Sequence, residues 1–244
     1  MDLHVHTCLS PCGDNSMVPA TIIERAQGAG LQGIAICDHN AAANASAVRE
    51  AGMEAGIGII AGMEVSSAEE IHLLALFDSF ANLQTFADLV KEHLSGENNP
   101  DLFGDQIVVD KSGDPVALET ALLIGAADLG IGRIVEEIHG LEGLAIASHV
   151  DKQNFSLLSQ LGFVPDDLAL DAVELSRHAG PLERYPLAKI GNLPLVRCSD
   201  AHFPEEIGQA YTTFLVKEVT VSEIALALAG NQGRKILAYE PRVA

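Results

Sequence analysis

DLHVH, residues 2–6, is a short run that carries two histidines one residue apart. Successive side chains of a β-strand point to opposite faces, so a strand here places His4 and His6 on one face and Leu3 and Val5 on the other. Two imidazole rings then converge on one point. The stretch therefore predicts a strand that carries metal-type ligands.

Six further apolar runs follow this one, and helix-like segments separate most of them. The predicted strands are 2–6, 33–39, 59–67, 71–77, 144–150, 172–177 and 195–202. The predicted helices are 18–30, 44–56, 80–96, 115–130, 132–140 and 221–230, each ending at or near glycine. Strands that alternate with helices indicate a parallel sheet of βαβ units.

Two connections depart from this alternation. Only residues 68–70 separate the third strand from the fourth, and a parallel crossover needs a dozen residues or more, so this pair is predicted to be a hairpin or sharp bend. Residues 96–114 form an irregular loop rich in Gly, Asn and Asp, with a small hairpin expected around 107–116.

Composition bounds the size, partners and location of the chain. With 244 residues and 48% hydrophobic content, a single domain over residues 1–244 is expected. The net charge of −20 repels a phosphate backbone, so a long nucleic-acid duplex is not an expected partner. The sequence contains no apolar run of 18 residues and no basic leader before the first strand, which favours a cytoplasmic protein without a membrane partner.

Metal-type side chains gather where the predicted strands end. They are His4, His6, His39, Glu64, His72, His149, Asp200 and His202. A satisfied buried side chain would explain any one of these histidines, but it does not explain the joint pattern. The carboxyl ends of strands in α/β barrels are where catalytic and binding residues collect. Mixed His and carboxylate ligands suit Zn, Mn or Fe, and eight groups exceed the four ligands of one zinc, so two or three divalent ions are expected.

Other polar residues near these strand ends have candidate roles. Asp38 is out of phase with His39 on its strand, so it is expected to orient a ligand. Lys152 and Arg177 follow strands and are candidate phosphate clamps, although a solvated surface position explains Lys152 equally well. His178, just beyond the sixth strand, is a candidate proton donor.

Five motifs resemble, in this order, those of the PHP (polymerase and histidinol phosphatase) family. They are DLHVHT, AICDHN, GMEV followed by HLL, ASHVD and CSDAH, and they extend from residue 2 to about residue 208. The resemblance implies an α/β fold, a distorted seven-stranded TIM-like β/α barrel with up to three metal ions at the C-terminal ends of its strands.

The resemblance also implies how the ligands divide among the ions. The first ion would be held by His4, His6, Glu64 and Asp200, and Glu64 would bridge to a second ion held by His72 and His149. The third would lie among Cys12, His39 and His202. Cys12 stands where relatives with three ions often carry histidine. The alternative is an uncoordinated thiol, with Asp14 or water completing the site.

The activity that the resemblance implies is metal-dependent phosphoester hydrolysis through a metal-activated hydroxide. The expected substrate is a small phosphomonoester, a nucleotide or a short oligonucleotide end. Three alternatives remain: a 5'-3' exonuclease on short single strands, an amidohydrolase-type hydrolase, and a non-catalytic metal-binding regulatory module. A GxSxG elbow and a P-loop are both absent from the sequence, so serine hydrolysis and nucleotide cradling have no support.

Overall fold

The computed structural model of the chain describes residues 1–180 and 190–241, and its centre is one seven-stranded sheet in the order β1-β2-β3-β4-β7-β8-β9. The strands are β1 (Asp2–Val5), β2 (Gly33–Ile36), β3 (Gly58–Ser66), β4 (His72–Phe77), β7 (Leu144–Ala147), β8 (Ala172–Leu175) and β9 (Leu195–Arg197). A parallel bridge between Val5 and Ala201 brings the segment after β9 back to β1, where the His6 N–H donates to the Ala201 carbonyl at 2.9 Å. The expected distorted seven-stranded barrel is therefore confirmed.

The β3–β4 connection is the predicted hairpin. The two strands pair antiparallel, with Ser66 opposite His72 and Glu64 opposite Leu74. β4 is also antiparallel to β7, whereas the other neighbours in the sheet are parallel. Because the hairpin reverses the chain at residues 67–71, the end of β3 and the start of β4 lie at the same rim.

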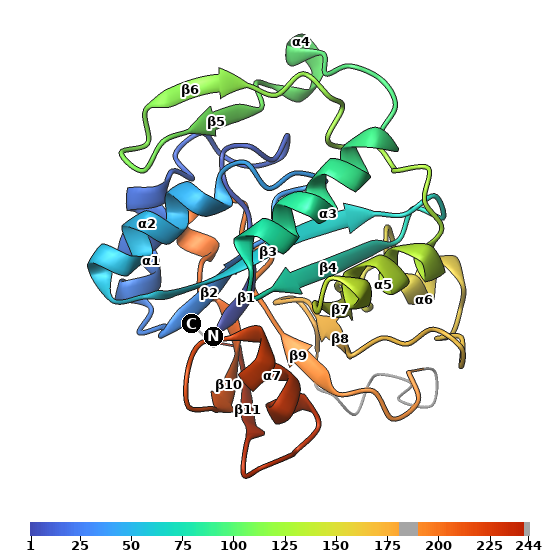
Figure 1. Cartoon of the computed structure of the whole chain (residues 1–244). Coiled ribbons are helices and arrows are strands. Elements are labelled where there is room, and N and C mark those ends of the chain that lie inside the picture. The colour runs from blue at the N-terminus through green and yellow to red at the C-terminus, as the bar shows by residue number, and fades with distance from the viewer. Residues whose placement is uncertain (181–189, 242–244) are drawn as a thin grey trace.

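Helices cover the outside of the sheet (Figure 1). They are α1 (Pro19–Gly28), α2 (Ala45–Ala55), α3 (Phe80–Glu92) and α5 (Ile131–Gly140), with short helices α4 (Pro100–Phe103) and α6 (Leu157–Gln160). Local sequence sets their ends: Pro19 occupies the first turn of α1, the Ser79 hydroxyl accepts from the Asn82 N–H at the start of α3, and Gly56 ends α2 with a φ of 72°.

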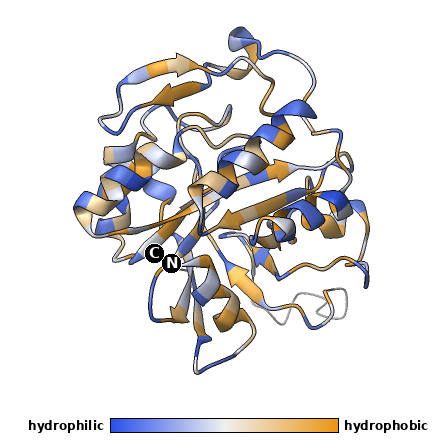
Figure 2. Cartoon of the chain, viewed as in Figure 1, coloured by the Kyte–Doolittle hydropathy of each residue, from blue (hydrophilic) through white to orange (hydrophobic). Residues whose placement is uncertain are grey.

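Two apolar layers alternate along the strands, one toward the helices and one inside the barrel. The inner layer takes residues from all seven strands, and Val221 and Ile224 of α7 (Val221–Leu228) join it. Figure 2 shows the strands of the sheet in orange and the surface helices in mixed colours. Leu3 belongs to the inner layer and Val5 to the outer one, because the register of β1 shifts between Asp2 and Val5. The expectation that Leu3 and Val5 share a face was wrong for this reason.

Two small antiparallel sheets of two strands each lie at opposite ends of the molecule (Figure 1). One pairs β5 (Ile107–Val109) with β6 (Pro115–Leu118), and the other pairs β10 (Ala210–Leu215) with β11 (Lys235–Pro241). The first was predicted around 107–116, but the helix predicted over 115–130 was wrong. The segment begins with β6, which is a strand. After β6, the carbonyls of Glu119 and Ala121 accept from the Gln106 side-chain amide. The second sheet, whose strands are connected through α7, was not predicted.

Among the described residues, the structure has no helix long and apolar enough to cross a membrane. The division of the chain into one domain over residues 1–244 stays a prediction.

Candidate metal centre

The rim at the C-terminal ends of the strands carries a cluster of histidines and acids. It comprises His4, His6, His39, Glu64, His72, His149, Asp200 and His202, all buried except His202, which is partly exposed. These are the eight residues that the strand ends singled out, and the structure brings them together.

Glu64 lies at the centre of the cluster. Its Oε1 is 3.0 Å from His72 Nδ1 and 3.1 Å from His149 Nε2. Its Oε2 lies 3.2 to 3.3 Å from one ring nitrogen of each of His39, His4 and His6. A carboxylate whose two oxygens face different sets of imidazoles has the arrangement that a bridging ligand between two ions requires.

Three overlapping groups place their ligand atoms within 4.8 Å of one another. They are His4, His6, Glu64 and Asp200; His39, Glu64 and His72; and His6, His39 and His202. The first group coincides with the set that the family resemblance implies for the first ion. In it, Asp200 Oδ1 is 3.4 Å from the Nε2 atoms of both His4 and His6.

Cys12 lies at the edge of this arrangement. It lines the cavity above the cluster and is exposed, but none of the three groups of described residues includes it. In the third group, His6 takes the position that was expected for Cys12 beside His39 and His202. The His6 and His202 rings are stacked, with their centroids 3.9 Å apart. Burial of the thiol group and the nearby carboxylate of Glu64 raise the pKa of Cys12 to about 12, so without a bound cation it stays protonated.

Hydrogen bonds behind the cluster fix the ring orientations. The Ser10 hydroxyl donates to Asp38 at 2.7 Å and lies 2.9 Å from His6 Nδ1, so it accepts from that nitrogen and leaves His6 Nε2 facing Glu64 and Asp200. Asp38 also accepts from the backbone and hydroxyl of Thr7. The structure thus places Asp38 behind a histidine, as its strand phase indicated.

Sequence reasoning missed Glu174. This carboxylate lies on β8 inside the barrel, fully buried, 3.0 Å from His4 Nδ1, and it accepts the backbone N–H of His149 at 3.2 Å. The available signal was an acid between Val173 and Leu175 in an otherwise apolar strand. A carboxylate on one imidazole nitrogen orients the other nitrogen toward a metal.

Electrostatics keep the acids ionised and two of the histidines neutral. Burial alone would raise the pKa of Glu64, but the electrostatic influence of the neighbouring imidazoles, His4 foremost, holds it well below its usual range. Asp200 behaves in the same way, with His4 and His6 opposing its burial. Burial lowers the pKa of His39 well below the usual range and that of His202 to about 3. Neutral imidazoles and ionised carboxylates are the forms that bind metals.

Unsatisfied atoms in the cluster fit divalent cations. Glu64 Oε2, Asp200 Oδ1 and His149 Nδ1 are buried without a hydrogen-bond partner in the described structure. The Nε2 atoms of His4 and His6 face each other at 3.0 Å. Buried lone pairs that converge in this way are costly unless a shared cation satisfies them. The residues present therefore fit a site for two or more metal ions, and the donor set fits Zn, Mn or Fe.

A cavity of about 450 Å³ opens onto the cluster, which is the size of a small-molecule site. Ile124, Gln153, Asn154 and Phe155 complete its lining beside the metal-type residues. Three of the seven described non-glycine residues with positive φ line this cavity: His149, Phe155 and Asp200, with φ values of 29°, 55° and 51°. Non-glycine residues in this region are uncommon and cluster at functional sites.

Lys152 and Arg177 have different surroundings. The Lys152 ammonium lies in the cavity and pairs with Asp200 Oδ2, and its side chain is 39% exposed. The Arg177 guanidinium is outside the cavity lining: it donates to the backbone carbonyls of Ser199 and Asp200 and pairs with Glu206. Arg177 therefore holds the backbone at Asp200, because the nitrogens of its guanidinium group already bind the carbonyls there and the Glu206 carboxylate.

The structure does not bring His178 into the site. Its side chain is exposed and does not contribute to the described lining of the cavity, because the chain turns away after β8, where the His178 N–H donates to the Ser176 hydroxyl at 3.1 Å.

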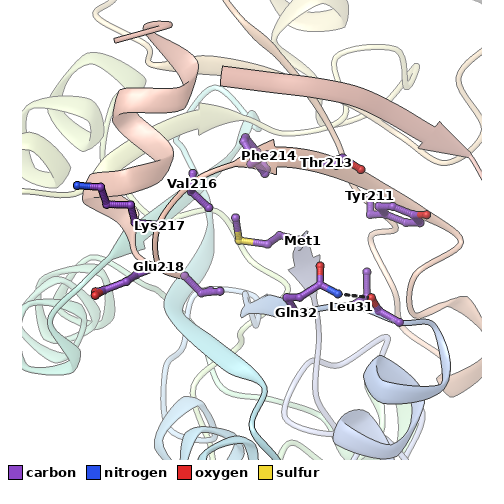
Figure 3. Close-up of a pocket in the computed structure, with 11 residues that line it drawn as sticks. Met1, Leu31, Gln32, Tyr211, Thr213, Phe214, Val216, Lys217 and Glu218 are labelled. Atoms are coloured by element: carbon purple, nitrogen blue, oxygen red, sulfur yellow. Dashed lines mark hydrogen bonds between the residues drawn. The ribbon is translucent and has the colours of Figure 1, made fainter. Parts of the chain in front are cut away.

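A second cavity, of about 280 Å³, lies at the other end of the barrel, beside residues that precede β1 and β2. Figure 3 shows Met1 in its middle, with Phe214 and Val216 on one side and Leu31 and Gln32 on the other. Its described lining lacks a group of metal-type residues. The candidate site is therefore the cluster at the C-terminal rim.

Comparison with known families gives two matches. Residues 2–152 match the PHP domain, and residues 186–231 match a PHP-associated segment. The first match contains six of the eight clustered residues, from His4 to His149, and also Lys152, while Asp200 and His202 fall within the second.

Two similar proteins illustrate the range of relatives. The chain is 30% identical over 123 residues to a 5'-3' exoribonuclease of Haemophilus influenzae, and this match covers 49% of this chain and 43% of the relative. It is 32% identical over 80 residues to a phosphoribosyl 1,2-cyclic phosphate 1,2-diphosphodiesterase of Eggerthella lenta, and this match covers 31% of this chain and 29% of the relative. The chain spans less than half the length of the curated relatives it matches.

Among solved structures, a lesion-specific endonuclease of Pyrococcus furiosus superposes with a TM-score of 0.74 at 22% identity. The superposition covers 100% of this chain and 59% of that one. Similarity at this level of identity establishes a shared fold.

Proposed function

Because this chain belongs to the PHP domain family, we propose that it is a metal-dependent phosphoesterase that hydrolyses a small phosphomonoester, a nucleotide or a short oligonucleotide end. The observation that carries the proposal is the buried position of Glu64 between two sets of imidazole nitrogens at the base of a cavity. The names of the relatives, an exoribonuclease and a phosphodiesterase among them, also favour phosphoester chemistry.

The proposal assigns the clustered residues to two or three divalent ions. The ligands would be His4, His6, His39, Glu64, His72, His149, Asp200 and His202, with Cys12 at the rim of the third position. When bound, such ions supply positive charge to phosphoryl oxygens and acidify a water molecule.

The remaining polar groups of the cavity would bind and orient the substrate. Burial would lower the pKa of Lys152, but Asp200 raises it, so the ammonium keeps its proton and can contact a phosphoryl oxygen. Asp38 and Glu174 would hold the His6 and His4 rings in place. Arg177 would act on the backbone at Asp200 rather than on the substrate.

The test combines metal analysis with turnover. Protein purified without chelator should contain two to three equivalents of Zn, Mn or Fe and should hydrolyse p-nitrophenyl phosphate. Glu64→Gln should lose both bound metal and turnover, whereas Glu136→Gln, at a side chain that is 75% exposed on α5, should keep both. Bound metal without turnover of any phosphoester would favour a regulatory module, and absence of metal would refute the proposal.

A nuclease that acts on short single strands is the second candidate, and the similarity to the exoribonuclease favours it. The net charge of −20 disfavours long strands. Stepwise release of mononucleotides from a 5'-phosphorylated oligonucleotide, faster than hydrolysis of a single nucleotide, would identify this activity. Release only of inorganic phosphate would identify a phosphomonoesterase.

A further inference from the structure

The cavity has two chemically different ends. The metal-type residues line one part of it, and two exposed apolar side chains, Ile124 and Phe155, contribute to the rest of the lining. Phe155 is 45% exposed and Ile124 is 39% exposed, and both side chains line the same cavity. Apolar side chains beside charged groups in one cavity point to a ligand that has both an apolar and a charged part.

Phe155 is held in place on one side. Its ring stacks on His72 with centroids 4.9 Å apart and an interplanar angle of 15°, and its carbonyl accepts the His72 N–H at 3.0 Å. His72 Nδ1 is in turn 3.0 Å from Glu64 Oε1. The phenyl ring therefore packs directly on a member of the metal-type cluster.

The backbone at Phe155 indicates that this position is constrained. A φ of 55° is in the left-handed region, where a bulky residue is an outlier. The exposed amides Gln153 and Asn154 precede it, and the buried Ser156, which caps α6, follows it. Strain of this kind persists where the surrounding structure fixes it, and it is concentrated at ligand sites.

We propose that Phe155 is a specificity-determining residue that stacks on a planar aromatic group in the alcohol part of the substrate. This inference rests on the proposed function and narrows it: the favoured substrates are phosphomonoesters with an aromatic ring close to the ester oxygen. A phosphoryl group on the cluster floor would leave the ring of such a substrate beside the free part of Phe155, with Ile124 supplying further apolar contact.

Binding of two phosphonates to the zinc-loaded protein tests this without requiring turnover. Phenylphosphonate and methylphosphonate share the charged group and differ in the ring, so the ratio of their Kd values, measured by titration calorimetry, isolates the aromatic contact. Wild-type protein should prefer phenylphosphonate, and Phe155→Leu should reduce that preference about two- to tenfold, the size of one aromatic pair.

Three further variants make the result decisive. Phe155→Tyr keeps the ring and should keep the preference. Phe155→Asn suits a left-handed backbone and should lose the preference as Phe155→Leu does. Phe163→Leu changes an aromatic residue that is 57% exposed outside this cavity and should alter neither Kd value.

Two results would overturn the inference. An equal weakening of both phosphonates in Phe155→Leu would mean that the residue acts only through His72. An unchanged ratio, or no binding of either phosphonate to the wild-type protein, would mean that Phe155 does not contact the ligand. Failure of the proposed function is detected separately, as absence of p-nitrophenyl phosphate hydrolysis by a protein that still shows the preference.

Discussion

Glu174 joins two strand ends through a single carboxylate. It lies 3.0 Å from His4 Nδ1 and accepts the His149 N–H at 3.2 Å, so it holds a ring of β1 and the backbone after β7 from one position on β8. The pKa of His4 is raised well above its usual range, because Glu174 and Glu64 together outweigh the effect of its burial. Glu174 therefore sets both the direction and the basicity of the His4 imidazole.

Replacement of Glu174 by glutamine should weaken metal binding without unfolding the protein. The amide keeps the volume of the side chain but removes the charge that supports His4, and loss of such a partner reduces metal affinity about 10- to 100-fold. Competition with a chelator of known affinity measures the change, and circular dichroism checks the fold. Glu136→Gln is the matched control, and equal affinity in both variants would contradict the assignment.

Strand alternation located the clustered residues because it fixes side-chain direction wherever a strand is regular. It predicted that His4 and His6 converge, and their Nε2 atoms do lie 3.0 Å apart, although the register of β1 shifts between Asp2 and Val5 and separates Leu3 from Val5. It could not place Arg177 and His178, which follow β8 in a turn whose course depends on hydrogen bonds to Asp151 and to the Asp200 carbonyl. The role of Glu174 was hidden because a buried acid in a strand identifies its partner only when the neighbouring strands are known.

At the scale of the element, close contact between β2 and β3 determines the position of Glu64. A Cβ atom added at Gly62 of β3 would lie 2.7 Å from Cys37 Sγ and 2.9 Å from the Ile36 carbonyl. Both contacts are below normal separation, and the second is to backbone that cannot rotate away. Only glycine fits at this point, two residues before Glu64.

Gly62→Ala should therefore destabilise the protein by about 1–3 kcal/mol, the usual cost of overpacking a well-packed core. Chemical denaturation measures the free energy of unfolding. Gly132→Ala, on α5 with open space around its Cβ position, should be neutral or stabilising by up to about 1 kcal/mol. Similar stability changes in the two variants would show that the β2–β3 contact does not restrict residue 62.

The segment after β6 is tied to α3 by Glu119. Burial alone would raise the pKa of Glu119, but the Ala121 N–H and the Lys91 ammonium, 2.8 Å from its Oε2, lower it below its ordinary value of 4.5. A lowered folded-state pKa contributes stability that is present above the unfolded-state pKa and lost as the pH falls through the folded-state value.

Amide exchange around residues 119–123 should thus accelerate, beyond the intrinsic pH effect, when the pH falls below about 4.5. Glu119→Gln should show the faster exchange already at pH 7 and little further change on acidification. Hydrogen exchange with mass spectrometry measures both. A wild-type protein whose protection in this segment does not depend on pH would contradict the role of the carboxylate.

Two elements show where sequence patterns were insufficient. Residues 115–130 have apolar residues at helix-like spacing, but Pro115 pairs with Val109 in the hairpin, and the Gln106 side chain contacts the backbone on both sides of Thr120. These contacts come from residues distant in the sequence. The strand β10, AYTTFL, contains aromatic and β-branched residues typical of strands, so its signal was present and was overlooked.

At the scale of the whole molecule, the proposed metal ions would connect most strands of the barrel. Without them, buried Glu64 and Asp200 each keep one oxygen that lacks a hydrogen-bond partner in the described structure. Ligands that bind only the folded state stabilise it, by about 2.7 kcal/mol at a concentration 100 times Kd.

Removal of metal with a chelator should lower Tm, and zinc or manganese should restore it, whereas magnesium should restore it less because the donor set is rich in nitrogen. Differential scanning calorimetry measures the shift. Glu64→Gln should show a smaller response to the same chelator. An unchanged Tm after complete metal removal would show that the cluster does not depend on ions for stability.

The bridge between Val5 and Ala201 has a consequence for the order in which the molecule is made. It joins the segment that holds His4 and His6 to the segment that holds Asp200 and His202, which are nearly 200 positions apart. At a synthesis rate of about 5–20 residues per second, the first histidines leave the ribosome about 10–40 s before their last partners. During that time the nascent chain offers His4 and His6 to the cell's metal pool without their full set of partners. A group of four ligands becomes available only when the final barrel strand and the residues after it have been translated.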